Sequence, residues 1–297
     1  NFHIVRAQLR DIHTHLPPKY YRELPKLADG PFKGLPRVYG IAWAFVAHTD
    51  SRFDPDMLVR FLKAYQQVQP LTIGELWAVS ITLRVVLIEN LRRISEHIAG
   101  AQEARGRADA IANEILGLGE QQGRPIEAVI VSLESEALSG AFIVQLLQRM
   151  RFQGSRFDPL LEWLEGHLAR EGLVPDALVS SEHNKQTMAN ATVRNIITSA
   201  RLMAAYDWQG FFEEVSLVEK ALRSHADYGK MDFATRNRYR QALEEVARYS
   251  KVSELELAWV VLQKCEEAKA AIQRGELQDE RRADPGYYLI SAGRFSL

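Results

Sequence analysis

One stretch of the chain, residues 71–97, is apolar on nearly every side when it is drawn as a helix. It begins with a capping box, because Thr72 and Glu75 stand three residues apart, where each side chain can satisfy a backbone N–H group of the other. A surface helix shows one apolar stripe, but here apolar residues surround the helix axis: Ile73, Leu76, Trp77, Val79, Ile81, Leu83, Val85, Val86, Leu87, Ile88, Leu91 and Ile94. We therefore expect a central helix that other helices wrap.

The chain has 297 residues, 46% of them hydrophobic and 25% charged, with a net charge of −1. This composition suits a globular protein with a sizeable core, and its near neutrality argues against a nucleic-acid-binding role. The one cysteine, Cys265, cannot form an internal disulfide and fits a reducing, cytoplasmic compartment. No apolar run is long enough to predict a membrane span. Because the chain begins without methionine, we interpret it as part of a longer protein.

Helix start and stop signals follow one another along the chain and predict an all-α fold of antiparallel helices around the buried central helix. We expect an N-terminal helix and a proline-rich connection in residues 1–36, a helical domain in residues 37–278, and a C-terminal tail in residues 279–297 that leads toward a next domain or a membrane segment. Gln102 to Leu118 is expected to form a separate, polar helix. Strand-like alternation is limited to Tyr287–Ile290.

The pentapeptide SRFDP occurs twice, at residues 51–55 and 155–159. In each copy, aspartate before proline is a favoured helix start, since aspartate caps the first N–H groups and proline fits the first turn. One interpretation is an internal duplication that relates two helical halves, residues 37–120 and 125–278, with the two motifs in equivalent turns that each cap a helix. The other is coincidence, because capping chemistry of this kind is common.

Three arginines lie in apolar helical stretches and are candidates for binding a ligand or for locking the packing. Arg84 lies on the central helix, where a buried charge needs a carboxylate or a carbonyl partner. It therefore either locks the helices together or binds an anionic ligand. Arg194 and Arg201 lie on a second apolar helix, near residues 176–206, and the same two interpretations apply to them.

Glycoside hydrolysis needs two carboxyl groups about 5–10 Å apart. Glu75, Glu89 and Glu96 share one face of the central helix, but a helix rises about 21 Å over fourteen residues and about 10.5 Å over seven, which is at the upper limit. Arg92 and Arg93 follow Glu89 by three and four residues, a spacing that favours ion pairing. Glu89 and Arg93 are therefore further candidates for ligand binding or packing, and we predict no catalytic residue.

No motif for a cofactor or a metal is present. The sequence GLGEQQGR at residues 117–124 lacks the Lys-Ser/Thr of a phosphate-binding loop, and no metal-ligand spacing such as HExxH occurs. We therefore expect no metal and no cofactor within this chain. The tryptophans are spread singly, which favours core anchors over a sugar-stacking platform: Trp43, Trp77, Trp163, Trp208 and Trp259.

Three long passages of the chain carry a family resemblance. They cover residues 35–95, 191–222 and 231–250, and read LPRVYGIAWAFVAHTDSRFDPDMLVRFLKAYQQVQPLTIGELWAVSITLRVVLIENLRRIS, ATVRNIITSARLMAAYDWQGFFEEVSLVEKAL and MDFATRNRYRQALEEVARYS. Together they resemble the N-terminal region of the bacterial cyclic β-1,2-glucan synthases. The resemblance implies a very large inner-membrane enzyme that builds a β-1,2-linked glucose chain from UDP-glucose on the protein itself, trims it by phosphorolysis and closes it to a ring.

The resemblance also implies what this chain lacks. The family's glucosyltransferase module carries metal-binding aspartate motifs and a QxxRW-type signature, and neither occurs here. UDP-glucose and a divalent metal are thus expected for that module of the parent enzyme, and no catalytic residue is carried over. The resemblance implies a helical, non-catalytic domain on the cytoplasmic side of the inner membrane that supports or regulates the transferase. Its partners would be other domains of the same polypeptide, with β-1,2-glucan as a candidate ligand and no nucleic acid.

Two alternatives stay open. A helical glycosidase-like domain acting on the glucan would show a cleft with two facing carboxylates. A protein-interaction array of helix pairs would show a concave surface and a repeating pair geometry. Whether a pocket converges on Arg84 and Glu89 is the observation that separates a binding role from a packing role for these residues.

Overall fold

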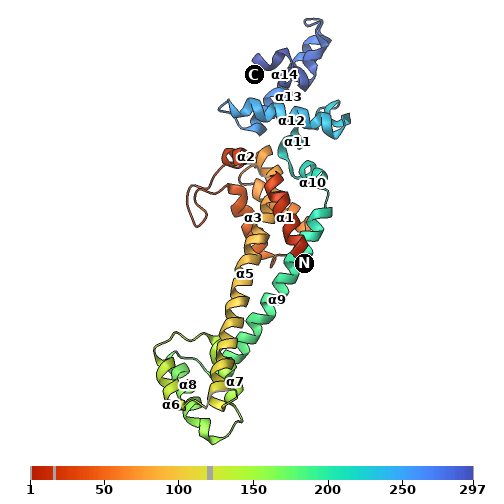
Figure 1. Cartoon of the computed structure of the whole chain (residues 1–297). Coiled ribbons are helices and arrows are strands. Elements are labelled where there is room, and N and C mark those ends of the chain that lie inside the picture. Colours follow the sequence, from red (N-terminus) through yellow and green to blue (C-terminus); the bar gives the residue numbers. More distant parts are fainter. Residues whose placement is uncertain (1, 16–17, 119–122, 297) are drawn as a thin grey trace. The chain divides into compact units, whose positions relative to one another are not determined.

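The computed structural model describes residues 2–15, 18–118 and 123–296. Within these residues the chain forms fourteen α-helices and four short 3-10 helices, and no β-strand (Figure 1). The predicted all-α fold is therefore confirmed. None of the described helices combines the length and the apolar character that crossing a membrane requires.

The chain divides into two compact units. Unit 1 consists of Asn1–Leu87 together with Thr198–Leu297, and unit 2 consists of Ile88–Ile197. Two long helices, α5 (Ile73–Leu116) and α9 (Pro175–Ala205), contribute residues to both units. The boundary between the units therefore falls inside α5 and inside α9, and neither helix is interrupted there.

This grouping differs from the consecutive halves, residues 37–120 and 125–278, that a duplication suggests. Unit 2 interrupts unit 1 in the sequence, because α5 and α9 run through both without a break. Unit 2 also contains three shorter helices: α6 (Ile126–Glu134), α7 (Gly140–Met150) and α8 (Asp158–Arg170).

Unit 1 contains the remaining helices. They are α1 (Phe2–His15), α2 (Pro18–Glu23), α3 (Arg37–His48), α4 (Pro55–Gln66), α10 (Trp208–Val215), α11 (Leu217–Leu222), α12 (Phe233–Arg248), α13 (Glu254–Gln273) and α14 (Pro285–Leu289). The short 3-10 helices are η1 (Ser155–Phe157) in unit 2, and η2 (Tyr228–Lys230), η3 (Glu280–Ala283) and η4 (Ala292–Ser296) in unit 1.

The first part of α5 is wrapped as predicted. The Thr72 N–H donates to a Glu75 carboxylate oxygen at 3.0 Å and the Glu75 N–H donates to the Thr72 hydroxyl at 3.1 Å, so the capping box is formed. The same carboxylate receives two hydrogen bonds from Arg37 of α3, at 2.8 and 2.5 Å. Nearly every residue from Ile73 to Leu87 is buried or half-buried. The wrapping ends there, since Ile88, Leu91 and Ile94 are only partly covered.

The separate helix expected from Gln102 to Leu118 is wrong, because α5 continues to Leu116. The residues between His97 and Gln102 include Gly100 but no proline. A glycine inside a helix costs about 1 kcal/mol relative to alanine, which is too little to end a helix that packing supports.

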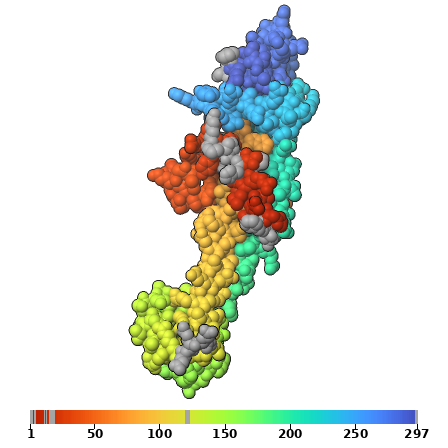
Figure 2. All heavy atoms as spheres, viewed as in Figure 1, coloured from red at the N-terminus to blue at the C-terminus, as the bar shows by residue number. Residues whose placement is uncertain are grey.

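Unit 2 has a core of its own, built where the last turns of α5 meet α6, α7 and α8. On α5, Ala108, Ala112 and Ile115 are fully buried against leucines of the shorter helices. In the space-filling view, the yellow-green and green segments of unit 2 form one closely packed body (Figure 2). The alanines in this part of α5 are thus explained, because small side chains allow close approach of neighbouring helices.

The first SRFDP motif caps a helix as predicted. Asp54 has an extended backbone and its carboxylate accepts the Met57 N–H at 2.9 Å, with Pro55 in the first turn of α4. Ser199 of α9 forms two hydrogen bonds with the backbone of this motif. The Ser199 hydroxyl donates to the Ser51 carbonyl at 2.7 Å and accepts the Phe53 N–H at 2.8 Å.

The second motif does not occupy an equivalent turn, so this prediction of the duplication hypothesis is wrong. Residues Ser155–Phe157 form the 3-10 helix η1, and Asp158 is already the first residue of α8. The N-cap of α8 is Phe157, which offers no side-chain acceptor. The same five residues therefore adopt two conformations, and the Ser199 hydroxyl bonds the backbone of the first copy only, among the described residues.

The C-terminal segment is folded against unit 1. Tyr287–Ile290, expected as a strand, lies mostly in helix α14. The reason is a third Asp-Pro pair: the Asp284 carboxylate accepts the Gly286 N–H at 2.6 Å, and Pro285 occupies the first turn. Tyr288 and Leu289 are buried, so this segment belongs to the core of unit 1.

Candidate functional site

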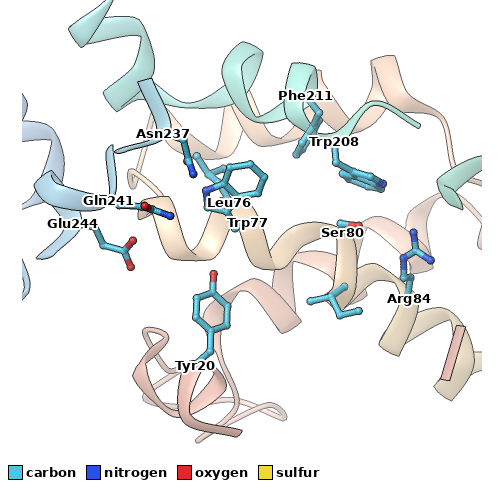
Figure 3. Close-up of a pocket in the computed structure, with 11 residues that line it drawn as sticks. Tyr20, Leu76, Trp77, Ser80, Arg84, Trp208, Phe211, Asn237, Gln241 and Glu244 are labelled. Atoms are coloured by element: carbon cyan, nitrogen blue, oxygen red, sulfur yellow. The ribbon is translucent and has the colours of Figure 1, made fainter. Parts of the chain in front are cut away.

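Unit 1 contains a pocket of about 720 Å³, which we call the aromatic pocket, between α2, α5, α10 and α12 (Figure 3). Its apolar lining residues are Leu76, Trp77, Ile81, Trp208 and Phe211. Its polar lining residues are Tyr20, Ser80, Arg84, Asn237, Gln241 and Glu244. The residues of α5 recur every three or four positions, which places them on one face of that helix.

Two indole rings are held rigidly at the wall of the pocket. Trp77 stacks on Phe212, with ring centroids 4.5 Å apart and planes inclined by 12°. The Trp208 Nε1–H donates to the Met203 carbonyl at 3.0 Å, and the ring packs on Phe211 at 5.3 Å. Both tryptophans are only half-buried, so part of each ring is available to the pocket.

Arg84 lines the pocket from α5 and is buried, with 8% of its surface exposed. Its guanidinium donates to the Gln8 side-chain oxygen at 2.8 Å and to the Met203 carbonyl at 3.2 Å. The prediction that Arg84 is buried and paired with an acidic side chain or a backbone carbonyl is confirmed. Arg84 and Trp208 share the Met203 carbonyl as an acceptor, so the guanidinium helps to position the pocket wall.

The polar end of the pocket is formed by α2 and α12. The Tyr20 hydroxyl donates to the Gly74 carbonyl, and burial raises the pKa of Tyr20. Burial also raises the pKa of Glu244, whose carboxylate accepts a 3.5 Å hydrogen bond from Arg248. Gln241 and Ser80 make no side-chain hydrogen bond with any residue that the structure describes. Their donors and acceptors are thus available to a ligand.

A second pocket of about 410 Å³, also in unit 1, includes Tyr20, Glu244 and Glu254 in its lining. The Glu254 carboxylate accepts the Ile73 N–H at 2.6 Å, so it caps the first turn of α5 from the first turn of α13. Burial raises the pKa of Glu254 to about 7, and the negative charges of Glu244 and Glu75 add to the effect. Two carboxyl groups with raised pKa values therefore line one cavity, although one of them is bonded to backbone.

The remaining candidate residues lie elsewhere. Glu89 forms an ion pair with Arg92 at 2.8 Å, which lowers the pKa of Glu89 through a side-chain hydrogen bond. Arg93 and Arg194 are exposed in unit 2, and Arg201 is exposed in unit 1. Of the five predicted residues, only Arg84 lines the aromatic pocket.

The prediction that all five tryptophans are isolated core anchors needs correction. Trp77 and Trp208 line the same pocket, and Trp259 on α13 has 54% of its surface exposed. The helical spacing of Trp77, Ser80 and Arg84 could have indicated a shared face. Nothing in the local sequence indicates that α10 and α12 complete the pocket, because they come from a distant part of the chain.

Other reactive groups do not form a site. In the described part of the chain, no three His, Cys, Asp or Glu side chains are grouped as a metal ion requires. Cys265 is buried, and burial raises the pKa of its thiol to about 12. A thiol with such a pKa is a poor nucleophile near neutral pH.

We compared the sequence of this chain with those of known proteins and protein families. No family model matches it. The cyclic β-(1,2)-glucan synthase NdvB of Rhizobium meliloti (strain 1021) is 35% identical to it over 298 residues, which is 100% of this chain and 10% of that protein. The chain thus spans about a tenth of the length of the relative. Identity at this level along the whole chain confirms the resemblance seen in the sequence, and the chain is related to a region of a cyclic β-1,2-glucan synthase.

Proposed function

We propose that this chain is a helical, non-catalytic region of a cyclic β-1,2-glucan synthase that supports the UDP-glucose-dependent transferase on the cytoplasmic side of the inner membrane. The observation that carries the proposal is the lining of the aromatic pocket. Among the described residues, it combines two tryptophans and several polar side chains with a single carboxylate, Glu244. Hydrolysis of a glycosidic bond needs two carboxyl groups, so this lining suits binding rather than cleavage.

A second candidate is a glycosidase-like activity on the glucan. It is favoured by the second pocket, where Glu244 and Glu254 both have raised pKa values, since a raised pKa favours the protonated carboxyl group that a general acid needs. Against it, the Glu254 carboxylate already accepts the Ile73 N–H and so stabilises the start of α5. We therefore rank the binding role first.

Two measurements test the proposed role. The purified chain should neither hydrolyse UDP-glucose nor transfer glucose from it, and it should leave linear β-1,2-glucan intact. Turnover of glucan that Glu244→Gln and Glu254→Gln abolish would establish the glycosidase alternative instead. In the full-length synthase, removal of the region that corresponds to this chain should reduce glucan synthesis.

The deletion needs a control for assembly, because loss of a large domain can prevent membrane insertion. The amount of synthase in the membrane fraction is measured beside the rate of synthesis. A deleted enzyme that reaches the membrane in normal amount and makes cyclic glucan at the usual rate would show that the supporting role is wrong.

A further inference from the structure

We propose that the aromatic pocket binds a neutral saccharide chain, and that its tryptophans carry the sugar rings. The class of ligand follows from the lining of the pocket, whereas the choice of a β-1,2-linked glucose chain rests on the proposed function. At about 720 Å³ the pocket lies within the range of roughly 300–1,000 Å³ that is typical of small-molecule sites. It is large enough for a short oligosaccharide segment.

The tryptophan rings at the wall of the pocket are fixed in position and can pack against a sugar ring. A pyranose ring has an apolar face of C–H groups that packs on an aromatic ring by dispersion. Trp77 is fixed because Phe212 covers one face of its ring. Trp208 is fixed by its hydrogen bond to the Met203 carbonyl. Rings that are already ordered lose little conformational entropy when a ligand binds.

Two polar side chains of the pocket have hydrogen-bonding groups that a sugar could use. The Gln241 amide can donate and accept, and so can the Ser80 hydroxyl, which matches the dual character of sugar hydroxyls. Neither side chain has a hydrogen-bond partner among the described residues. In Figure 3, Gln241 and Glu244 lie at one end of the pocket and Arg84 lies at the other, with Trp77 and Trp208 between them. A ligand spanning the pocket would thus meet polar groups at both ends and aromatic rings between them.

The charge of the lining residues also indicates a neutral ligand. Of the described residues that line the pocket, one is a carboxylate, Glu244, and one is a guanidinium, Arg84, so their formal charges balance. The Arg84 guanidinium already donates to Gln8 and to the Met203 carbonyl. Recognition of a nucleotide diphosphate relies on several cationic or backbone N–H donors that converge on the phosphates. A neutral glucan therefore suits this pocket better than UDP-glucose.

The test uses the chain of 297 residues and a short linear β-1,2-linked glucooligosaccharide, with binding measured by calorimetry. Gln241→Ala removes an exposed side chain and should weaken binding about tenfold, the effect of one or two lost hydrogen bonds. Ser80→Leu breaks no hydrogen bond of the described chain but fills the pocket, and it should abolish binding. Trp208→Ala should weaken binding at least as much as Gln241→Ala.

Trp259→Ala is the matched control, because Trp259 is an exposed tryptophan of unit 1 outside the pocket. It should bind the oligosaccharide like the unaltered chain. Circular dichroism shows whether each variant is folded. Binding that is insensitive to Ser80→Leu and Gln241→Ala would overturn the assignment, and so would an absence of binding or a preference for UDP-glucose.

The binding experiment and the deletion experiment can fail independently, so they test the site and the supporting role separately. A chain that binds glucan in the pocket, in a synthase that works normally without this region, would refute the supporting role and leave the site established. A synthase that fails without the region, together with a chain that binds no glucan, would refute the site alone.

Discussion

The carboxylate of Glu219 and the guanidinium of Arg240 lie 2.6 Å apart, and neither side chain is exposed to solvent. Glu219 also accepts hydrogen bonds from the Tyr228 hydroxyl and from Arg223, both at 2.7 Å. The Arg240 guanidinium lies over the ring of Phe212, 5.0 Å from its centroid. Because Phe212 is the ring on which Trp77 stacks, this buried ion pair connects the packing of α11 and α12 to the wall of the aromatic pocket.

Arg240→Ala should therefore destabilise unit 1 by about 3–5 kcal/mol, since removal of one partner leaves a buried charge incompletely compensated. Urea unfolding followed by circular dichroism measures the change. Arg201→Ala is the control, because Arg201 is exposed in the same unit. Equal stability of the two variants would contradict the structural importance of the Glu219–Arg240 pair.

Arg84→Ala should also destabilise unit 1. It removes the donor of two hydrogen bonds, to the Gln8 side-chain oxygen and to the Met203 carbonyl, and each buried acceptor left without a donor costs about 1–3 kcal/mol. The loss should also disturb Trp208, which shares the Met203 carbonyl, so tryptophan fluorescence should change along with the melting temperature. A variant with unaltered melting and fluorescence would show that Arg84 neither supports the packing of α5 nor positions Trp208.

Glu254→Gln should change how stability depends on pH. The pKa of Glu254 is raised from 4.5 to about 7 in the folded chain, so the folded state binds this proton more tightly than the unfolded state does. The resulting stabilisation is fully present below pH 4.5 and is lost as the pH rises to about 7, by at most about 3 kcal/mol. The melting temperature of the unaltered chain should thus fall, relative to that of Glu254→Gln, between pH 5 and pH 7.5.

Glu256→Gln is the control for this titration, because Glu256 lies in the same helical turn and its pKa is shifted in the opposite direction. Its hydrogen bonds with Ser253 lower the pKa of its carboxyl group. The unaltered chain should therefore gain stability relative to Glu256→Gln as the pH rises through the acidic range. The same pH trend in both variants would exclude a raised pKa at Glu254.

Ser199→Ala should destabilise the turn that starts α4. The hydroxyl bridges the Ser51 carbonyl and the Phe53 N–H, so its removal leaves two buried backbone groups unpaired, at a cost of about 1–3 kcal/mol. Ser181→Ala on the same helix is the control, since Ser181 is exposed. If both variants unfold at the same urea concentration, Ser199 does not hold the first SRFDP motif in its extended conformation.

Local signals in the sequence predicted the elements of this fold well. The capping box at Thr72 is formed, and Asp54 caps α4, because each interaction joins groups only three residues apart. The same type of signal was missed at Asp284, where Asp-Pro starts α14. The mistaken equivalence of the two SRFDP motifs has a different cause, since the first motif depends on Ser199, far away in the sequence.

The sequence by itself therefore determined an all-α chain, the buried start of α5 and the relationship to a glucan synthase. Only the tertiary structure decided that α5 continues into a second unit, and that Trp77, Trp208 and Gln241 line one pocket. The physical reason is the distance along the chain over which each interaction acts. Caps and helical periodicity act within one or two turns, whereas a pocket exists only after helices from separate parts of the chain have packed together.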